Sequence, residues 1–333
     1  MKSFIVERYA KTGAVRAAER PDPEINADEV LVHVEAAGVN PLDSKIAAGE
    51  FKLILPYRPP FVLGHDLAGV VARVGPAVTQ FAPGDTVYAR PGDFRVGTFA
   101  ELISVREKDL ALKPTTISYE QAASLPLVAL TAWQALVEKG RISPGQKVFI
   151  HAGSGGVGTI AIQLAKHLGA SVATTTSTAN VEWVRDLGAD IVIDYTVEDF
   201  EKVLSGYDLV LDSLGPESLL KSLNILKPGG IAIGIGGPPD PSFAKDIGAN
   251  PVVKLATRIL SRKVRKAARR LGVRYSFLFM TANGDQLREI AKLVDAKAIR
   301  PVVDRVFPFD KTLDALDYVD TGRVKGKVVL SMG

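Results

Sequence analysis

The segment 148–158 constrains the fold of this chain more than any other. It reads V-F-I-H-A-G-S-G-G-V-G, an apolar run followed by the G-x-G-x-x-G spacing of Gly153, Gly155 and Gly158. The periodic apolar run 160–168 then predicts a helix. A strand, a glycine turn and a helix in this order cradle an anion, because the helix N-terminus presents free backbone N–H groups and the positive end of its dipole. We therefore predict a dinucleotide-binding unit; the alternative is a tight glycine turn in another α/β protein.

Glycine is expected in this turn because a Cβ would block the pyrophosphate or be strained at positive φ. From residue 146 onward, short apolar runs alternate with helical segments, which is typical of a parallel sheet covered on both faces. Six strands are the number in a doubly wound dinucleotide domain. The predicted strands are 148–151, 171–175, 191–194, 209–212, 231–235 and 275–280, and the predicted helices are 160–168, 181–187, 198–204, 217–226 and 285–297.

The part of the chain before residue 120 has a different pattern. Short β-branched runs are separated by Gly and Pro, as in a barrel-like antiparallel fold. A helical stretch over 119–139 is interrupted near Pro126, and the segment 299–333 returns to short apolar pieces. We predict an α/β chain in which residues 1–119 and 299–333 form one domain and residues 120–298 form an inserted, doubly wound domain.

The chain contains no cysteine in its 333 residues. This excludes disulfides, thiolate-ligated metals and a cysteine nucleophile. Residues 1–20 lack a signal-like apolar segment and no apolar run is long enough to span a membrane, so we expect a cytoplasmic protein. His65 could bind a metal or carry a proton, but an isolated histidine is more often structural. Since the other histidines are His33, His151 and His167, zinc would lack its usual ligands, and we predict no metal site.

The loop after the second predicted strand bears on the choice of dinucleotide. NAD sites usually carry an acid there for the ribose 2′-hydroxyl, but residues 174–180 read T-T-T-S-T-A-N. Hydroxyls and an amide can bind a 2′-phosphate that a carboxylate would repel, so we predict NADP(H). The alternative is a merely polar loop. The loop contains no Lys or Arg, so positive charge would have to come from Arg185 or Lys325.

The basic residues are concentrated in one segment. No acid lies between Asp246 and Asp285, an interval that holds nine of the 41 basic residues. We predict one amphipathic helix over 251–272 and favour a helical excursion that covers the substrate cleft with its charges in solvent. The alternative is weak contact with an anionic membrane surface. The cations lack interleaved aromatic residues, so we expect no nucleic-acid partner.

Together these features resemble the medium-chain dehydrogenase/reductase superfamily, and within it the zinc-free quinone oxidoreductase branch, which is zeta-crystallin-like. Zinc-dependent relatives carry Cys where this chain has Asn40. The resemblance implies a GroES-like barrel, an inserted Rossmann domain and an active site in the cleft between them. The segments that carry it are 38–43, 63–71, 82–85, 123–126, 130–133, 152–158, 187–190, 226–230 and 326–330.

The resemblance also implies roles for individual residues. Asn40 and Thr131 would lie near the nicotinamide, although from the sequence alone we favour turn and helix-cap roles for Asn40 and Asp43. Lys45 is a candidate oxyanion neighbour, the alternative being a solvated helix lysine. The implied cofactor contacts are Asn40, Thr131, Gly153, Ser154, Gly155, Gly156, Val157, Gly158, Thr175, Ser177, Tyr195 and Lys325, and the implied catalytic set is Asn40, Asp43, Lys45 and Thr131.

The resemblance implies NADPH-dependent reduction of quinones or α,β-unsaturated carbonyls. Without zinc to polarise a plain carbonyl, we expect weak alcohol dehydrogenase activity. Two alternatives are an enoyl-thioester reductase and a nucleotide-binding protein with little turnover. The apolar run 275–280 would be an open edge of the sheet, so we also expect a homodimer.

Overall fold

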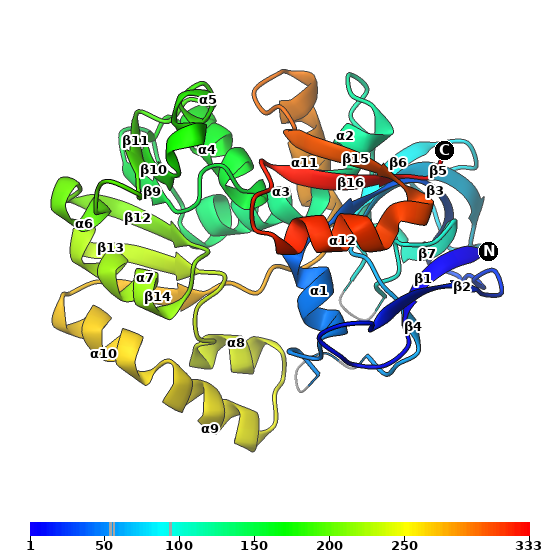
Figure 1. The fold of residues 1–333 in the computed structure, drawn as a ribbon, viewed down its shortest axis with the longest axis horizontal. Coiled ribbons are helices and arrows are strands. Elements are labelled where there is room, and N and C mark those ends of the chain that lie inside the picture. The colour runs from blue at the N-terminus through cyan, green and yellow to red at the C-terminus, as the bar shows by residue number, and fades with distance from the viewer. Residues whose placement is uncertain (53–54, 56, 93–94) are drawn as a thin grey trace. The chain divides into compact units, whose positions relative to one another are not determined.

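The computed structural model describes residues 1–52, 55, 57–92 and 95–333 (Figure 1). The chain forms two compact units, one from Met1–Leu130 with Thr281–Gly333 and the other from Thr131–Met280. Among the described residues, no helix combines the length and the apolar character needed to cross a membrane.

The first unit is a mainly antiparallel β structure. Its long strand β3 is buried along most of its length and pairs with β5, β7 and β16. One sheet has the order β15-β16-β3-β5-β6-β8, with β7 also on β3, and a smaller sheet has the order β2-β1-β4. The strands are β1 Lys2–Val6, β2 Val15–Glu19, β3 Glu29–Val39, β4 Phe61–Val62, β5 Asp66–Val74, β6 Thr86–Ala89, β7 Leu102–Arg106, β8 Leu110–Leu112, β15 Val303–Pro308 and β16 Lys327–Ser331.

Short helices close this unit. The C-terminal segment adds a helix, α12, that the sequence pattern did not indicate. The helices are α1 Pro41–Ala47, η1 Glu107–Asp109, α2 Tyr119–Ala123, α11 Gly284–Asp295, η5 Phe309–Lys311 and α12 Thr312–Asp320; α3 Pro126–Trp133 runs from this unit into the next.

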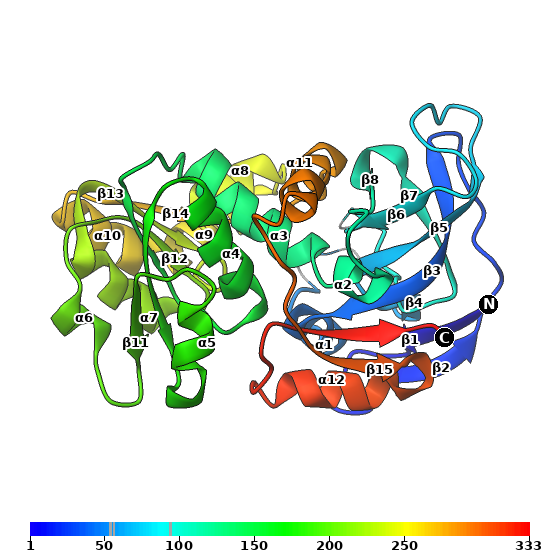
Figure 2. The same ribbon diagram turned by 90° about the horizontal axis from the view of Figure 1, so that it is seen from above.

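The second unit is a doubly wound parallel sheet, as predicted. All six expected strands form, in the order β11-β10-β9-β12-β13-β14, so the chain reverses direction across the sheet between β9 and β12. Helix α4 packs on β9 and β10, whereas α7 and α10 pack on β12, β13 and β14, and Figure 2 shows helices on both faces. The strands are β9 Lys147–Ile150, β10 Ser171–Thr176, β11 Ile191–Asp194, β12 Tyr207–Asp212, β13 Leu226–Gly234 and β14 Arg274–Phe277.

Most predicted helices form here with shifted ends. The stretch predicted over 119–139 ends in a π-helix, η2. The helices are η2 Gln134–Lys139, α4 Gly156–His167, η3 Thr178–Asn180, α5 Val181–Arg185, α6 Phe200–Val203, α7 Pro216–Ser222, η4 Leu223–Ile225, α8 Pro241–Asp246, α9 Pro251–Leu260 and α10 Arg262–Arg270.

The single helix predicted over 251–272 is two helices. The break lies at Ser261, which is buried and whose hydroxyl donates to the Thr257 carbonyl oxygen at 2.6 Å. Val264 and Ala268 then anchor α10 in the core under the sheet, while α9 buries only Thr257. Apolar residues recur with a helical period on both sides of Ser261. The sequence pattern therefore could not show that one helix ends there and another begins.

The boundaries between the units differ from the predicted ones. The first unit extends to Leu130, beyond residue 119, and resumes at Thr281 rather than at residue 299. Helix α11 belongs with the barrel because the Tyr88 hydroxyl donates to the Leu287 carbonyl oxygen at 2.5 Å. A Cβ on Gly284 would lie 2.2 Å from the Leu110 carbonyl oxygen, so glycine allows this close packing.

Candidate functional site

The glycine turn joins β9 to α4. The one residue of the turn with positive φ is Ala152, at 53°, so the glycines are not required by backbone strain as we expected. Close packing requires two of them instead. A Cβ on Gly153 would lie 2.3 Å from the Thr174 hydroxyl oxygen, and one on Gly158 would lie 2.2 Å from the Ala152 carbonyl oxygen. The turn therefore packs closely against β10 and against its own first residue, Ala152.

The start of α4 forms an anion cradle, by which we mean residues 153–158. Gly155 is the N-cap residue, and the Thr159 N–H donates to its carbonyl oxygen at 2.9 Å. Within the described chain, the N–H groups of Gly156, Val157 and Gly158 have no backbone acceptor outside the helix. Free N–H groups at the positive end of a 12-residue helix fit a pyrophosphate, so the residues present suit a dinucleotide.

Threonines at the carboxyl end of β10 hold this turn. The Thr175 hydroxyl oxygen accepts from the Ala152 N–H at 3.3 Å, and its carbonyl oxygen accepts from the Gly153 N–H at 2.9 Å. Thr175 is 3% exposed, so its side chain is a buried support of the turn. The hydroxyl oxygen of the next residue, Thr176, is buried without a hydrogen-bond partner.

Ser177 and Tyr195 lie after neighbouring strands, because β10 and β11 pair with Thr176 opposite Asp194. The Ser177 hydroxyl accepts from the Asn180 side-chain amide at 3.0 Å. Tyr195 is 63% exposed, so its ring is available to a ligand. The exposed Asp194 carboxylate accepts from the Thr196 hydroxyl at 2.7 Å, and hydrogen bonds from Thr178 and Thr196 lower its pKa.

A buried polar network surrounds Asn40 in the first unit. The Asn40 amide donates to Asp66 Oδ2 at 2.9 Å and its oxygen accepts from Lys327 Nζ at 2.5 Å. Lys327 Nζ also lies 3.2 Å from Asp66 Oδ2. Asp43 Oδ2 accepts from the Asn40 backbone N–H at 2.7 Å, which is one half of a capping box at the start of α1, and Asp43 Oδ1 lies 2.6 Å from His65 Nδ1.

All five residues of this network are at most 5% exposed. The sequence indicated Asn40 and Asp43 but not Asp66 or Lys327. The signal lies in the strand pairing, because β16 pairs with β3 so that Val328 stands opposite Val39, and Lys327 therefore reaches Asn40. No local pattern brings together residues 287 positions apart.

The other predicted site residues are distributed as follows. Lys45 is exposed on α1, and Thr131 is 4% exposed in α3. Lys325 is exposed in the turn before β16 and belongs to the first unit. Ser154 is half-buried in the glycine turn, and Arg185 forms an ion pair with Glu182 at 2.7 Å.

A second polar cluster lies where the sheet reverses, at the ends of β9 and β12. The Ser222 hydroxyl donates to the Ser218 carbonyl oxygen at 2.9 Å, so it accepts from His151 Nε2–H at 2.8 Å. Burial lowers the pKa of His151 to about 3, and the imidazole is therefore neutral. Burial also raises the pKa of Asp212, whose Oδ2 lies 3.6 Å from His151 Nε2. The sequence treated His151 only as a member of a strand.

Metal-ligand geometry does not occur in the described parts of the chain: no three His, Cys, Asp or Glu side chains there could hold an ion together. In the network around Asn40, a lysine ammonium lies against the Asp66 carboxylate.

Comparison with known proteins identifies the fold family. Residues 26–115 match the family described as alcohol dehydrogenase GroES-like domain, and residues 187–330 match the family described as zinc-binding dehydrogenase. The NADPH-dependent alkenal/one oxidoreductase of Arabidopsis thaliana chloroplasts is 39% identical over 99% of this chain and 79% of its own length.

Solved structures agree with the sequence matches. The quinone oxidoreductase from Coxiella burnetii is 30% identical and superposes with a TM-score of 0.85 over 100% of this chain and 99% of that one. A mycobacterial protein solved with NADPH is 28% identical and superposes with a TM-score of 0.82 over 99% of both chains. The chain belongs to the medium-chain dehydrogenase/reductase superfamily, in the zinc-free branch that contains the quinone oxidoreductases.

Proposed function

We propose that this protein is an NADPH-dependent reductase that transfers hydride to a quinone or an α,β-unsaturated carbonyl without a metal. The observation that carries the proposal is the anion cradle of residues 153–158, in a chain without cysteine and without an acid in the loop 174–180. The names of the Arabidopsis and Coxiella relatives support this substrate class.

When bound, NADPH supplies the hydride, and the protein binds and orients. The N–H groups of Gly156, Val157 and Gly158 would donate hydrogen bonds to the pyrophosphate, and Thr175 holds the turn in place. Ser177 and Tyr195, with the buried Thr176 hydroxyl beneath them, are proposed to contact the 2′-phosphate and adenine.

Asn40 and Thr131 are the proposed neighbours of the nicotinamide, with Asp43 and Lys45 in the catalytic set. The Asn40 amide nitrogen donates to Asp66 Oδ2 and to the Gly38 carbonyl oxygen, and the amide oxygen accepts from Lys327 Nζ, so these contacts fix the orientation of the side chain. Asp43 acts by fixing the backbone of Asn40. A conjugated carbonyl or quinone is already electrophilic, and water can protonate its reduced oxygen, so the chemistry needs no further acid from the protein.

The test is NADPH oxidation with a small quinone and with a short-chain enone, before and after treatment with EDTA. We expect turnover that EDTA does not change. Tight NADPH binding without turnover on either class would direct attention to acyl thioesters, the substrates of an enoyl-thioester reductase. Failure with those as well would favour a nucleotide-binding protein with little turnover.

We also propose a homodimer formed at the open edge of the sheet. Strand β14 ends the sheet order and has no strand on its outer side among the described residues. An exposed strand edge invites pairing with a second copy. Light scattering at micromolar concentration should give the mass of two chains, and the mass of one chain would contradict the dimer.

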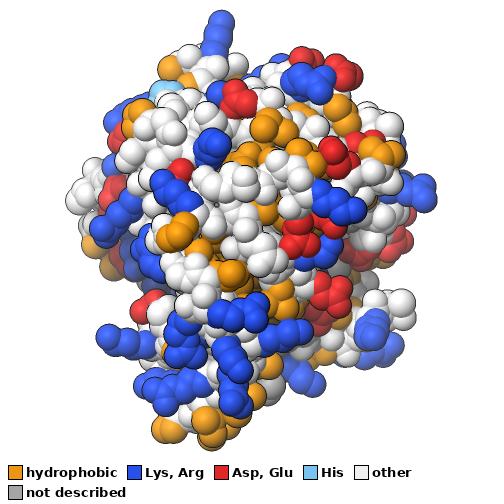
Figure 3. All heavy atoms as spheres, turned by 90° about the vertical axis from the view of Figure 1, so that its left-hand side faces the viewer, with side chains coloured by type: hydrophobic (Ala, Val, Ile, Leu, Met, Phe, Trp, Pro, Cys, Tyr) orange, Lys and Arg blue, Asp and Glu red, His pale blue; other side chains and the backbone are white. Residues whose placement is uncertain are grey.

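We also propose that helix α9 makes a weak contact with an anionic membrane surface, which was the alternative to a helix with all its charges in solvent. Four of its aliphatic side chains are more than half exposed, and cations lie beside them (Figure 3). The exposed aliphatic residues are Val252 at 76%, Leu255 at 58%, Ile259 at 63% and Leu260 at 61%. Salt-sensitive sedimentation with phosphatidylserine vesicles would support the contact, and no sedimentation at low salt would exclude it.

The cytoplasmic location stays a proposal that rests on the absence of cysteine.

A further inference from the structure

Ser177 follows the strand end that is tied to the anion cradle. Two residues earlier, the Thr175 carbonyl oxygen accepts from the Gly153 N–H at 2.9 Å, so the end of β10 and the glycine turn are held together. In dinucleotide sites, the side chain that meets the ribose 2′ position follows this second strand, about 20 residues after the glycines. Ser177 occupies that position, and it is half-buried, so one side of it is open to a ligand.

Two hydrogen bonds fix the direction in which Ser177 can donate. Trp183 Nε1–H donates to Asn180 Oδ1 at 2.9 Å. An indole N–H is a donor only, so the amide atom that faces it is the oxygen, and the amide nitrogen faces Ser177. Asn180 Nδ2 donates to Ser177 Oγ at 3.0 Å. The Ser177 oxygen therefore accepts from Asn180, and the hydroxyl hydrogen points away from that residue.

The Asn180 side chain serves this contact instead of the usual helix cap. Asn180 is the N-cap residue of α5, yet its side chain accepts no hydrogen bond from a backbone N–H of that helix. Two donors then have no acceptor among the described residues: the Ser177 hydroxyl and the second N–H of the Asn180 amide. A phosphate group presents only acceptors, so this donor pair matches it.

The neighbouring hydroxyl of the loop is already engaged. Thr178 Oγ1 lies 3.1 Å from Thr196 Oγ1, and the Thr196 hydroxyl donates to Asp194 Oδ1 at 2.7 Å. Hydrogen bonds from both threonines lower the pKa of Asp194, so its carboxylate stays charged and holds these hydroxyls. Thr178 thus belongs to the Asp194 carboxylate, whereas Ser177 and Asn180 keep donors for a ligand.

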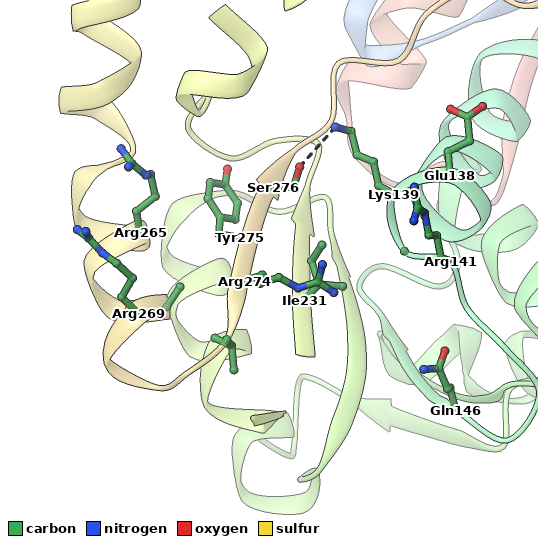
Figure 4. Close-up of a pocket in the computed structure, with 13 residues that line it drawn as sticks. Glu138, Lys139, Arg141, Gln146, Ile231, Arg265, Arg269, Arg274, Tyr275 and Ser276 are labelled. Carbon is green, nitrogen blue, oxygen red and sulfur yellow. Dashed lines mark hydrogen bonds between the residues drawn. The ribbon is translucent and has the colours of Figure 1, made fainter. Parts of the chain in front are cut away.

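The concentrated positive charge of the second unit lies at the other edge of its sheet. Strands β10 and β14 are four strand spacings apart, roughly 19 Å. Between β10 and β11 the sequence holds one cation, Arg185, and it forms an ion pair with Glu182 at 2.7 Å. The loop after β10 therefore offers neutral donors. Figure 4 shows the pocket beside β14, whose lining cations are Lys139, Arg141, Arg265, Arg269 and Arg274.

We propose that Asn180 and Trp183 are positioning residues for the 2′-phosphate of NADPH. Trp183 orients the Asn180 amide, and the amide directs the Ser177 hydroxyl and its own second N–H toward the phosphate. A hydrogen bond to a charged phosphate is about twice as strong as one to the neutral ribose hydroxyl of NADH, so the same donors favour NADPH. The inference rests on the proposed use of NADPH and assigns its specificity to neutral side chains.

The test is calorimetric titration with 2′-phospho-ADP-ribose and with ADP-ribose, which differ only in the 2′-phosphate. We expect the parent protein to bind the phosphorylated compound about tenfold or more tightly. Asn180→Ala should remove most of this preference and leave the Kd of ADP-ribose unchanged. Trp183→Phe keeps an aromatic ring but removes the N–H, which frees the amide to turn, so the preference should fall by about two- to fivefold.

The control is Thr178→Ala, which removes the hydroxyl next to Ser177 that is engaged with Asp194 and Thr196. Its preference for the phosphorylated compound should stay within about twofold of the parent value. A loss in the control as large as that in Asn180→Ala would point to the whole loop and overturn the assignment to Asn180.

Three further results would overturn the positioning role. One is a preference that neither Asn180→Ala nor Trp183→Phe reduces, which would leave the use of NADPH intact. Another is an equal loss of affinity for both compounds, which would show a structural effect on the fold. A loss in Asn180→Ala with none in Trp183→Phe would remove Trp183 from the assignment. Equal binding of the two compounds by the parent protein would instead contradict the proposed use of NADPH itself, and no turnover is needed to see it.

Discussion

Lys327 Nζ lies 3.2 Å from Asp66 Oδ2, and the two side chains are 6% and 0% exposed. Lys327 comes from the last strand of the chain and Asp66 from the start of β5, so the pair connects the two separate segments that form the first unit. Asn40 is held between them. The Lys327 ammonium group therefore compensates the charge of the buried Asp66 carboxylate.

Replacing Lys327 by Met should leave a buried carboxylate without its partner. We expect the free energy of unfolding to fall by about 3–5 kcal/mol. Lys325→Met is the control, because Lys325 is exposed and two residues away; it should change the stability by less than about 0.5 kcal/mol. Guanidinium unfolding followed by circular dichroism measures both values, and equal stability of the two variants would show that the buried pair contributes nothing.

The glycine turn predicts a graded response to an added methyl group. Gly158→Ala places a Cβ 2.2 Å from the Ala152 carbonyl oxygen, so the turn must move and NADPH affinity should fall by more than about tenfold. In Gly155→Ala the nearest atom is 3.3 Å away, and the loss should be smaller. Fluorescence titration with NADPH compares the variants. The packing argument fails if Gly155→Ala is the more damaging change.

The buried His151 predicts a loss of stability as the pH falls. Its folded-state pKa is lowered to about 3 from the ordinary value of 6.5, so below pH 6.5 the unfolded chain takes up a proton that the folded protein refuses. The free energy of unfolding should therefore decrease by up to about 1.4 kcal/mol per pH unit through this window.

The contribution of His151 is clearest above about pH 5, where carboxylates have taken up few protons. His151→Asn should flatten the dependence of stability on pH there, whereas His33→Asn, at a histidine that is 53% exposed, should leave it unchanged. Urea unfolding at several pH values gives the slopes. The same slope in His151→Asn and the parent protein would mean that another group is responsible.

The acid-free loop after β10 predicts how the cofactor preference can be changed. Ser177→Asp would place a negative charge where the 2′-phosphate is proposed to bind, so the Michaelis constant for NADPH should rise by about tenfold or more while that for NADH changes little. Ser171→Asp adds the same charge at the other end of the same strand and serves as the control. An equal effect of Ser177→Asp on both cofactors would exclude this loop from 2′-phosphate recognition.

The sequence predicted the parallel sheet well because each of its six strands is a short segment that is local in the chain, and the apolar residues of the central strands β9 and β12 are buried. The glycine spacing likewise marks a cradle formed within a dozen residues. The network around Asn40 could not be predicted, since Asp66 and Lys327 reach it only through the pairing of β16 with β3 and of β3 with β5. The unit boundaries failed for the same reason: α11 follows the sheet in sequence, but Tyr88 and Gly284 attach it to the barrel.

The most direct measurement compares NADPH consumption with a short-chain enone and with its saturated ketone, using the same enzyme preparation treated with EDTA. We expect the enone to be reduced more than about tenfold faster, because its conjugated carbon is already electrophilic, whereas a plain ketone would need a zinc ion to polarise its carbonyl. Comparable rates on the two substrates, or activity that EDTA abolishes, would contradict a metal-independent reductase of conjugated carbonyls.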